Sequence, residues 1–232
     1  MRKFADCQEN MDLMAPKAFV SWSSGKDSAF ALYEARRLGL AEIVGILTTV
    51  NEKYDRVAMH GVRHELLDRQ IEALGLPAIK VLIPSPCPNE VYEARMDGAC
   101  ATIKAQGIEH IVFGDLFLED IRAYREEKLS AIGMRGIFPL WQRDTRKLAN
   151  EMVECGLVAH LICVNPKNLD ASFAGRPFDV ALLRDLPAEV DPCGENGEFH
   201  TVVSRGPMFF RPIGISIGEI VEREGFVFAD AI

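Results

Sequence analysis

An apolar segment that runs straight into a serine- and glycine-rich turn, and then into a helix, constrains this chain more than any other feature. The apolar residues Ala18, Phe19 and Val20 are followed at residues 23–28 by Ser-Ser-Gly-Lys-Asp-Ser, and a helical pattern continues from Ala29. The first turn of a helix has unpaired N–H donors and a partial positive charge, which together favour an anion. We therefore predict a strand, a phosphate-binding turn and a helix here.

The side chains of this turn suit a nucleotide phosphate with a metal ion. Lys26 and the hydroxyl groups of Ser23 and Ser28 strengthen the positive field, whereas the carboxylate of Asp27 opposes it. A carboxylate beside bound phosphate is favourable when it holds Mg²⁺, whose charge then dominates the site. An ordinary strand-to-helix turn, capped by Asp27 or Ser28, fits the same six residues equally well.

Apolar runs alternate with helical patterns up to about residue 140, which is typical of β-α-β units and a parallel sheet. The predicted strand over residues 42–50 is almost continuously apolar, as expected where helices cover both faces of a sheet. Residues 51–61 are expected to form a loop. The other predicted strands are 78–83, 110–114 and 135–141, and the predicted helices are 27–38, 62–74, 89–106 and 116–132.

The pattern changes from Asp144, where short strands separated by glycine and proline follow one helix. We predict a smaller α+β lobe there. The first residues carry three carboxylates and lack the apolar core of a signal peptide, so we expect a terminal extension. The predicted organisation is an extension (1–16), a nucleotide-binding domain (17–140) and a C-terminal substrate domain (141–232), the last with a helix at 144–154 and strands at 157–164, 199–204, 213–217 and 225–228.

Polar residues follow two of the predicted strands at their carboxyl ends, where ligands gather in open α/β sheets. Thr48 and Thr49 end one of these strands, and Gly114 and Asp115 end the other. We expect these residues to line a nucleotide crevice. The predicted helix after Asp115 is highly charged, which fits either a solvated face or a contact to phosphate or substrate.

The composition argues against several classes of protein. A net charge of −8 and a pI near 5.2 disfavour a general nucleic-acid-binding surface. No apolar run reaches the roughly 18 residues of a membrane span. The six cysteines are scattered without a C-x-x-C pair, which disfavours a disulfide framework or a zinc ribbon. We expect a cytoplasmic protein with no membrane partner.

A second stretch, residues 191–201, is unusually polar for a segment that precedes a strand. It reads Asp-Pro-Cys-Gly-Glu-Asn-Gly-Glu-Phe-His-Thr. Such a segment fits a glycine-rich hairpin loop with solvated acids. It also offers Glu195, Glu198 and His200 as groups that can accept a proton.

The two stretches together resemble one known family. Residues 23–28 are similar to the Ser-Gly-Gly-x-Asp-Ser loop of the PP-loop ATP pyrophosphatases, with Ser24 at a usual glycine position. Residues 191–201 resemble the C-terminal signature of the diphthine–ammonia ligase family within that superfamily. The resemblance also includes Met59-His60-Gly61, Gly114-Asp115, Arg122 with Glu126, Pro139-Leu140-Trp141 and Arg143-Asp144.

The resemblance implies a Rossmann-like five-stranded parallel sheet of the adenine nucleotide α-hydrolase type, with a smaller C-terminal α+β domain. It also implies an ATP-dependent ligase that adenylates a carboxylate, releases pyrophosphate and forms an amide with ammonia. The residues expected to bind ATP are Ser23, Ser24, Gly25, Lys26, Asp27, Ser28, Thr48, Thr49, Gly114 and Asp115, with Asp27 on Mg²⁺. The expected catalytic residues are His60, Glu195, Glu198 and His200, and the expected substrate contacts are Arg122, Glu126, Cys193, Gly194 and Asn196.

Some assignments have a plainer alternative. His60 on its own also fits a hydrogen-bonded loop residue, and Cys193 fits a passive thiol better than a nucleophile. Two other functions stay open as well. A PP-loop tRNA-modifying enzyme is disfavoured because paired cysteines and a basic surface are missing, and a non-catalytic nucleotide-binding regulatory module has no need of Asp27 or the acidic second stretch.

The partners that the resemblance implies are ATP, ammonium and a carboxylate acceptor. In the family's named activity the acceptor is diphthine on elongation factor 2, which belongs to archaea and eukaryotes. In a bacterial chain the acceptor would be an unknown small molecule or protein. A homodimer is also compatible with the sequence.

Overall fold

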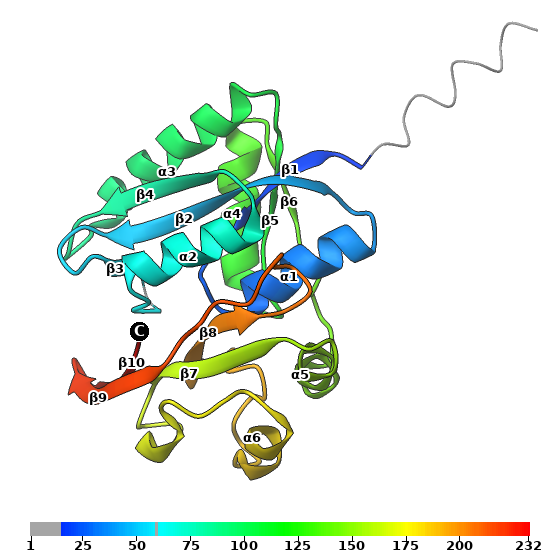
Figure 1. Ribbon diagram of the computed structural model, residues 1–232. Coiled ribbons are helices and arrows are strands. Elements are labelled where there is room, and N and C mark those ends of the chain that lie inside the picture. Colours follow the sequence, from blue (N-terminus) through cyan, green and yellow to red (C-terminus); the bar gives the residue numbers. More distant parts are fainter. Residues whose placement is uncertain (1–14, 59) are drawn as a thin grey trace, which may run out of the picture.

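The computed structural model describes residues 15–58 and 60–232. The extension predicted over residues 1–16 therefore lies outside the described residues, except for its last two positions. The described chain forms two sheets, and one pair of helices lies between them (Figure 1). This layering brings the two lobes into contact along the phosphate-binding turn.

Five parallel strands form the first sheet, in the order β4-β2-β1-β5-β6. The five-stranded parallel sheet expected from the sequence is therefore confirmed. A short sixth strand, β3 (Arg56–Val57), pairs antiparallel with the end of β2, inside the segment predicted to be a loop. The parallel strands are β1 (Lys17–Ser21), β2 (Glu42–Asn51), β4 (Ala78–Ile83), β5 (His110–Val112) and β6 (Arg135–Ile137).

Four helices cover the two faces of this sheet. Successive side chains of a strand point to opposite faces, and β1 shows the result. Ala18 and Val20 pack against the helices α1 and α2, whereas Phe19 packs with α3 and α4 on the other face. Apolar residues on both faces explain the continuous apolar strands of the sequence. The helices are α1 (Lys26–Arg37), α2 (His64–Leu74), α3 (Asn89–Lys104) and α4 (Glu119–Ala131).

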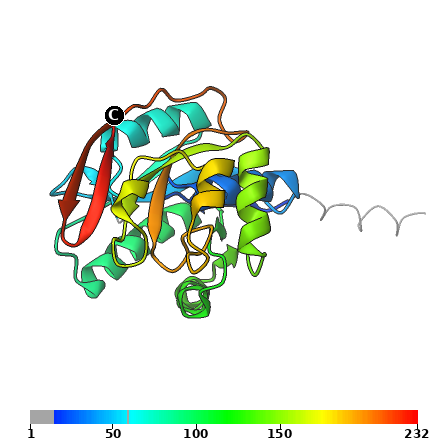
Figure 2. The same cartoon turned by 90° about the horizontal axis from the view of Figure 1, so that it is seen from below.

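The C-terminal lobe is built on a four-stranded antiparallel sheet with the order β8-β7-β10-β9. This confirms the predicted smaller α+β lobe, whereas its boundary near residue 140 stays a prediction. Figure 2 shows the β9–β10 hairpin (red) at one edge of the molecule. The elements are α5 (Thr145–Glu154), β7 (Val158–Val164), the 3₁₀ turn η1 (Ala171–Phe173), α6 (Val180–Asp185), β8 (Phe199–Arg205), β9 (Ile217–Arg223) and β10 (Phe226–Ala231).

Three local predictions are wrong. The strand predicted at 213–217 is absent from that position, because the N–H of Ile213 donates to the carbonyl of Ser204 and β9 begins only at Ile217. The strand predicted at 135–141 ends at Ile137, where Pro139 leads into a turn. The sequence also missed α6, which is too short for a periodic signal and is capped by Asp179.

A buried glutamine joins the two lobes. Gln70 of α2 is fully buried, and its Nε2 donates to the carbonyl oxygens of Ser24 (3.2 Å) and Val203 (2.8 Å). Its Oε1 accepts from the indole nitrogen of Trp22 at 3.1 Å. One side chain therefore satisfies polar groups from β8 and from the turn after β1. Such groups are costly to leave unpaired away from water.

Two further features bear on the predicted setting of the protein. Within residues 15–58 and 60–232, no helix combines the length and apolar character needed to cross a bilayer. The five cysteines in this part of the chain are free thiols.

We predict that Gln70→Ala lowers the free energy of unfolding by about 2–4 kcal/mol, because the buried indole N–H of Trp22 loses its partner and the carbonyls of Ser24 and Val203 each lose a hydrogen bond. Urea denaturation measures this change. The control is Gln106→Ala, since the amide of Gln106 lies on an exposed helix end and bonds only to Thr102 within the described chain. Equal stability of the two variants would contradict the bridging role of Gln70.

Candidate functional site

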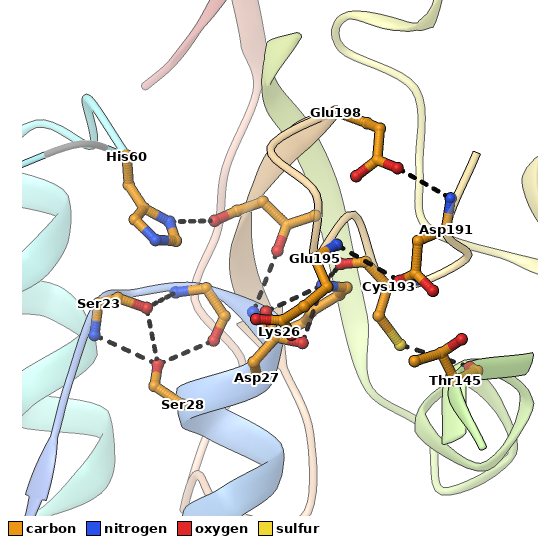
Figure 3. A network of polar contacts seen from close by, with 12 residues as sticks. Ser23, Lys26, Asp27, Ser28, His60, Thr145, Asp191, Cys193, Glu195 and Glu198 are labelled. Atoms are coloured by element: carbon orange, nitrogen blue, oxygen red, sulfur yellow. Dashed lines mark hydrogen bonds and ion pairs between the residues drawn. The ribbon is translucent and has the colours of Figure 1, made fainter. Parts of the chain in front are cut away.

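The turn after β1 is held in shape by its own serines. The N–H of Ser23 donates to Oγ of Ser28 (3.2 Å), and the two hydroxyl oxygens lie 3.1 Å apart. The hydroxyl of Ser28 also donates to the carbonyl of Gly25 at 3.0 Å (Figure 3). Gly25 is the N-cap of α1, so this network orients the first turn of the helix toward one side.

Ser24 occupies the position where the family pattern has glycine, and its backbone shows why. Its φ is +71°, in the left-handed region that glycine adopts without a steric penalty. The side chain is fully buried, and its hydroxyl has no hydrogen-bond partner among the described residues. Ser24 therefore contributes its backbone conformation to the turn, and its hydroxyl makes no hydrogen bond to the described residues.

Strand β8 supports this turn from the second lobe. The N–H of Lys26 donates to Oγ1 of Thr201 at 3.0 Å, and the N–H of Val203 donates to the carbonyl of Ser24 at 3.0 Å. Lys26 and Ser24 are thus held by residues about 175 positions later in the chain. The last residue of the second motif, Thr201, therefore contacts the 23–28 turn directly.

Lys26 lies inside the wall of the site. Its side chain is 2% exposed, and Nζ lies 2.9 Å from both carboxylate oxygens of Asp27 and contacts the carbonyl of Cys193. Burial acts to lower the pKa of Lys26, but nearby acidic groups, Asp27 first among them, outweigh it and raise that pKa. The lysine is therefore a permanent positive charge that ties the first motif to the second.

A cavity of about 370 Å³ opens between the two motifs. It is bounded by the 23–28 turn, the segment after β5, the start of α4 and the 193–200 segment. The predicted site residues that line it are Ser23, Asp27, Ser28, His60, Gly114, Asp115, Cys193, Gly194, Glu195 and His200. The structure therefore brings most of the residues selected from the sequence to one place.

Gly114 allows the segment after β5 to lie against the start of α1. A Cβ atom at Gly114 would lie 2.7 Å from the backbone carbon of Asp27, 2.8 Å from its oxygen and 2.9 Å from the N atom of Ser28. All three neighbours are backbone atoms, which have no side-chain freedom to move aside. The glycine is needed here for close approach, since the segment that follows it forms a wall of the cavity.

Glu198 organises the second motif from within. Its carboxylate accepts from the N–H of Asp191 (3.0 Å), the N–H of Asn196 (2.9 Å) and the side-chain amide of Asn196 (3.1 Å). It is 3% exposed and points toward Asp191 in Figure 3. Glu198 was predicted from the sequence to be catalytic. In the structure its carboxylate bonds to Asp191 and Asn196 within the same loop and does not line the cavity.

Glu195 lies on the cavity side of the same loop. Burial raises the pKa of Glu195 to about 8, and the negative charges of Asp27, Asp115 and Asp191 add to this rise, whereas Lys26 opposes it. The carboxyl group consequently titrates close to neutral pH. A group with such a pKa can both accept and release a proton under physiological conditions.

His60 and His200 both line the cavity, with ring centroids 4.6 Å apart and ring planes inclined at 37° to each other. Nδ1 of His60 lies 3.3 Å from the carbonyl oxygen of Thr201, so this nitrogen carries the proton that the bond requires. Burial, followed by His200 and Lys26, lowers the pKa of His60 to about 3. Burial also lowers the pKa of His200. Both imidazoles are therefore neutral, and Nε2 of His60 keeps a free lone pair.

Cys193 behaves as a passive thiol in this structure. It is 2% exposed, its sulfur contacts the carbonyl of Thr145 at 3.4 Å, and burial raises the pKa of the thiol. A thiol that does not ionise is a poor nucleophile. The backbone carbonyl of Cys193, in contrast, accepts a hydrogen bond from Nζ of Lys26 and so links the two motifs.

The sequence missed Arg125, which lines the cavity. Nε of Arg125 lies 2.8 Å from Oδ2 of Asp115, and its guanidinium stacks 4.5 Å from the centre of the Phe113 ring. Neither Nε nor Oδ2 has an aligned hydrogen bond within the described chain, although both are buried. Ile121 also lines the cavity, and Arg125 follows it by four positions. Residues four apart lie on the same face of a helix, so this spacing is the signal that places Arg125 on the cavity face of α4.

Four predicted residues lie away from the cavity and from the two segments that enclose it. Arg122 pairs with Glu126 on α4 at 2.8 Å, and its guanidinium lies 4.6 Å from the ring centres of both Phe138 and Trp141. Thr48 and Thr49 lie on β2, the strand that pairs directly with β1. Thr48 is 2% exposed and its hydroxyl has no partner within the described residues.

Comparison with known proteins agrees with this geometry. A profile of the diphthamide synthase N-terminal domain matches residues 16–136, and a profile of the diphthamide synthase C-terminal domain matches residues 144–229. Diphthine–ammonia ligases from Bos taurus and Danio rerio are 24% and 28% identical, over 89% of this chain and 85% and 89% of theirs. One from Schizosaccharomyces pombe is 28% identical over 86% of this chain, which spans only 36% of that relative.

We predict that Gly114→Ala lowers the free energy of unfolding by about 1–3 kcal/mol, because the new methyl group overlaps backbone atoms of the turn. Thermal denaturation measures the loss. The matched control is Gly98→Ala on the exposed side of α3, where no heavy atom lies within 4 Å of the added carbon. A tolerated Gly114→Ala would show that the two segments are not held so closely.

We predict a characteristic pH dependence of stability from Glu195. Its pKa is about 8 in the folded protein, against 4.5 for an unperturbed glutamate. The folded protein binds this proton more tightly, so its contribution to stability is complete below about pH 4.5 and is lost as the pH rises to about 8. Glu195→Gln cannot ionise, so its free energy of unfolding should not fall in this way as the pH rises. At pH 8 the variant should therefore have a higher free energy of unfolding than the wild type.

Urea denaturation from pH 5 to pH 9 would measure this difference between variant and wild type, in steps of about half a unit. Glu154→Gln at the exposed end of α5 is the control. A constant difference across this range would contradict the assigned titration.

Proposed function

This chain is a member of the diphthamide synthase family, and on that premise we propose that it is an ATP-dependent ligase that adenylates a carboxylate and converts it to an amide with ammonia. The observation that carries the proposal is one cavity with the 23–28 turn on one side and the 193–200 segment on the other. A ligase of this kind needs both a phosphate-binding turn and a proton acceptor within reach of the same reacting atoms.

The turn is the proposed site of the β- and γ-phosphates of ATP. The hydroxyl groups of Ser23 and Ser28 line the cavity, and the first N–H groups of α1 lie beside them. Lys26 adds positive charge from within the wall through its contacts with Asp27 and Cys193. Such fixed donors stabilise charge that develops on leaving pyrophosphate without having to reorganise.

The adenosine of ATP is proposed to lie toward the carboxyl ends of β2 and β5. Thr48 and Thr49 lie in the last four residues of the first of these strands, which ends at Asn51, and Gly114 and Asp115 come after the second. The unpaired hydroxyl of Thr48 is compatible with a nucleotide contact after local adjustment. Arg122 and Glu126 pair with each other on α4 and do not line this cavity, so they are not proposed as substrate contacts.

The cavity also suits Mg²⁺. Asp27 and Asp115 both line it, and in the free protein each pairs with a cationic side chain, Asp27 with Lys26 and Asp115 with Arg125. No group of three protein ligands is assembled among the described residues. Mg²⁺ in nucleotide sites is commonly held by one or two carboxylates plus phosphate oxygens. Bound there, it would neutralise negative charge on the phosphates.

In the proposed reaction, an oxygen of the acceptor carboxylate attacks the α-phosphorus and pyrophosphate leaves. The negative charge that repels nucleophiles is thereby removed from the acceptor. Ammonia then attacks the acyl carbon, and AMP leaves as the amide forms. The similarity to diphthine–ammonia ligases supports diphthine and ammonia as the substrates.

Glu195 is the proposed proton acceptor for the ammonia step, once a bound cation in the cavity favours its ionised form. Its pKa of about 8 lies close to working pH, whereas the pKa of His60, about 3, makes that imidazole a weak base. His60 and His200 are instead proposed to orient ammonia as neutral hydrogen-bonding groups. Glu198 and Asn196 hold the loop that presents Glu195, and Gly194 lets that loop turn in the left-handed region (φ +71°).

We predict that the wild type converts ATP to AMP and pyrophosphate, and not to ADP and phosphate, when ammonium and elongation factor 2 carrying diphthine are supplied. Asp27→Asn keeps the shape of the side chain and removes its charge, so acceptor-dependent AMP formation should fall at least about 10-fold, the scale of a lost charge-assisted contact. Chromatography of α-labelled ATP measures both products.

Asp120→Asn, on an exposed part of α4, is the matched control and should leave the rate unchanged. ADP as the first product would rule out the proposed reaction. Unaltered turnover by Asp27→Asn would remove the carboxylate from its proposed role on Mg²⁺.

A cytoplasmic location remains the prediction made from the cysteine pattern.

A further inference from the structure

Arg125 of α4 lines the cavity proposed to bind ATP, and the reaction described so far gives it no role. The same cavity is lined by three carboxylates, those of Asp27, Asp115 and Glu195. Among the described lining residues, Arg125 is the one lysine or arginine, since Lys26 is 2% exposed and does not line the cavity. A nucleotide that enters the cavity therefore meets one such cation on its surface.

Two contacts position the guanidinium of Arg125. It lies 4.5 Å from the centre of the Phe113 ring, and its Nε lies 2.8 Å from Oδ2 of Asp115. Phe113 and Asp115 are the neighbours of Gly114 in the segment after β5. Stacking on an aromatic face restricts the plane of a guanidinium and leaves its N–H groups directed along that plane. The arginine is therefore oriented at the segment that walls the cavity.

The pair with Asp115 lacks an aligned hydrogen bond. Nε of Arg125 and Oδ2 of Asp115 are both buried, yet neither makes such a bond within the described chain. An arginine–carboxylate pair is strongest when two aligned N–H groups meet the two oxygens. This contact falls short of that geometry, so a ligand with better-placed oxygens can replace it. A phosphate group is such a ligand, because its oxygens match the fork of a guanidinium.

The position of Arg125 favours one phosphate of ATP. The β- and γ-phosphates are proposed to lie at the 23–28 turn, and adenosine toward the carboxyl ends of β2 and β5. The α-phosphate links these two groups, so it belongs where the turn meets the segment after β5. Gly114 marks that place, because a Cβ atom there would lie 2.7 Å from the backbone carbon of Asp27. Arg125 contacts the residues on both sides of Gly114.

We propose that Arg125 is a catalytic residue that binds the α-phosphate of ATP, exchanging its partner Asp115 for oxygens of this phosphate. This inference rests on the proposed ligase function. Once Arg125 has turned to the phosphate, the carboxylate of Asp115 is available to a cation in the cavity. The ion pair of the free protein thus keeps both charged groups neutralised until the nucleotide arrives.

The proposed contact acts on the first chemical step. A new bond forms between an oxygen of the acceptor carboxylate and the α-phosphorus. The bond from this phosphorus to the bridging oxygen breaks, and its electron pair leaves with pyrophosphate. Negative charge on the oxygens of the α-phosphate has to be stabilised during this exchange, and a guanidinium already in place does so without reorganising.

Calorimetric titration with AMP and with pyrophosphate tests the contact without turnover. AMP presents the α-phosphate alone, whereas pyrophosphate presents only the leaving group. Arg125→Gln removes a charge-assisted contact, so it should raise the Kd for AMP at least 10-fold and leave the Kd for pyrophosphate within about threefold. Retained binding of pyrophosphate also shows that the variant is folded. Loss of affinity for both ligands alike would contradict a specific contact to the α-phosphate.

Arg122→Gln is the matched control, three positions earlier on the same helix. The guanidinium of Arg122 lies over the rings of Phe138 and Trp141 and does not line the cavity. This variant should leave both Kd values unchanged. If Arg122→Gln weakened AMP binding as much as Arg125→Gln, the effect would be a general loss of positive charge, and the proposal would be overturned.

A purely structural role of Arg125 predicts a different pattern in a second variant. If the arginine only holds Asp115 in place, Asp115→Asn should weaken AMP binding as Arg125→Gln does. If the arginine exchanges partners, Asp115→Asn removes a competitor for the guanidinium and a charge that repels phosphate. AMP, titrated in EDTA to exclude metal ions, should then bind at least about threefold more tightly. Unchanged or weaker binding would overturn the exchange.

The outcomes separate this inference from the function on which it rests. Suppose that the wild type forms AMP with the acceptor and that Arg125→Gln binds AMP normally. The role of Arg125 would then be overturned, and the ligase function would stand. A wild type that bound neither AMP nor pyrophosphate would overturn the proposed nucleotide site and, with it, the role of Arg125.

Discussion

The contact between β8 and the turn after β1 is the interaction on which the whole site depends. The hydroxyl of Thr201 accepts from the N–H of Lys26, and the N–H of Val203 donates to the carbonyl of Ser24. Gln70 secures the same junction from α2. Because these groups are buried, water cannot replace a lost partner, and the junction remains closed. Buried hydrogen bonds therefore join the two lobes beside the cavity.

Negative charge crowded around a single buried lysine gives this cavity its chemical character. Lys26 holds Asp27 directly and lies in the field of Glu195. Asp27, Asp115 and Asp191 together raise the pKa of Glu195 beyond the effect of burial. Lys26 and Arg125, which pairs with Asp115, do not neutralise all these carboxyl groups, so the free protein retains a proton on Glu195 near neutral pH. Metal ions and ammonium, both cations, are the natural ligands of such a cavity.

Some parts of the architecture could be predicted because they depend on local sequence. Continuous apolar strands indicated a doubly covered parallel sheet, and the Ser/Gly turn indicated an anion site at the start of α1. The short elements were less predictable. Ile213 was expected in a strand, but its N–H pairs with Ser204, a partner that only the folded chain supplies. Arg125 was likewise hidden in a charged helix, since its role depends on which helix face meets β5.

The sequence by itself determined the two motifs, the sheet that carries the first of them and the family to which they belong. Only the tertiary structure decided how the four proton acceptors differ. Glu198 and Glu195 are three residues apart on one loop, yet one accepts backbone N–H groups beneath the loop and the other faces the cavity. His60 is neutral because burial and His200 disfavour its charge. Hydrogen bonding and desolvation are set by neighbours distant in the chain, so residue type alone could not distinguish these roles.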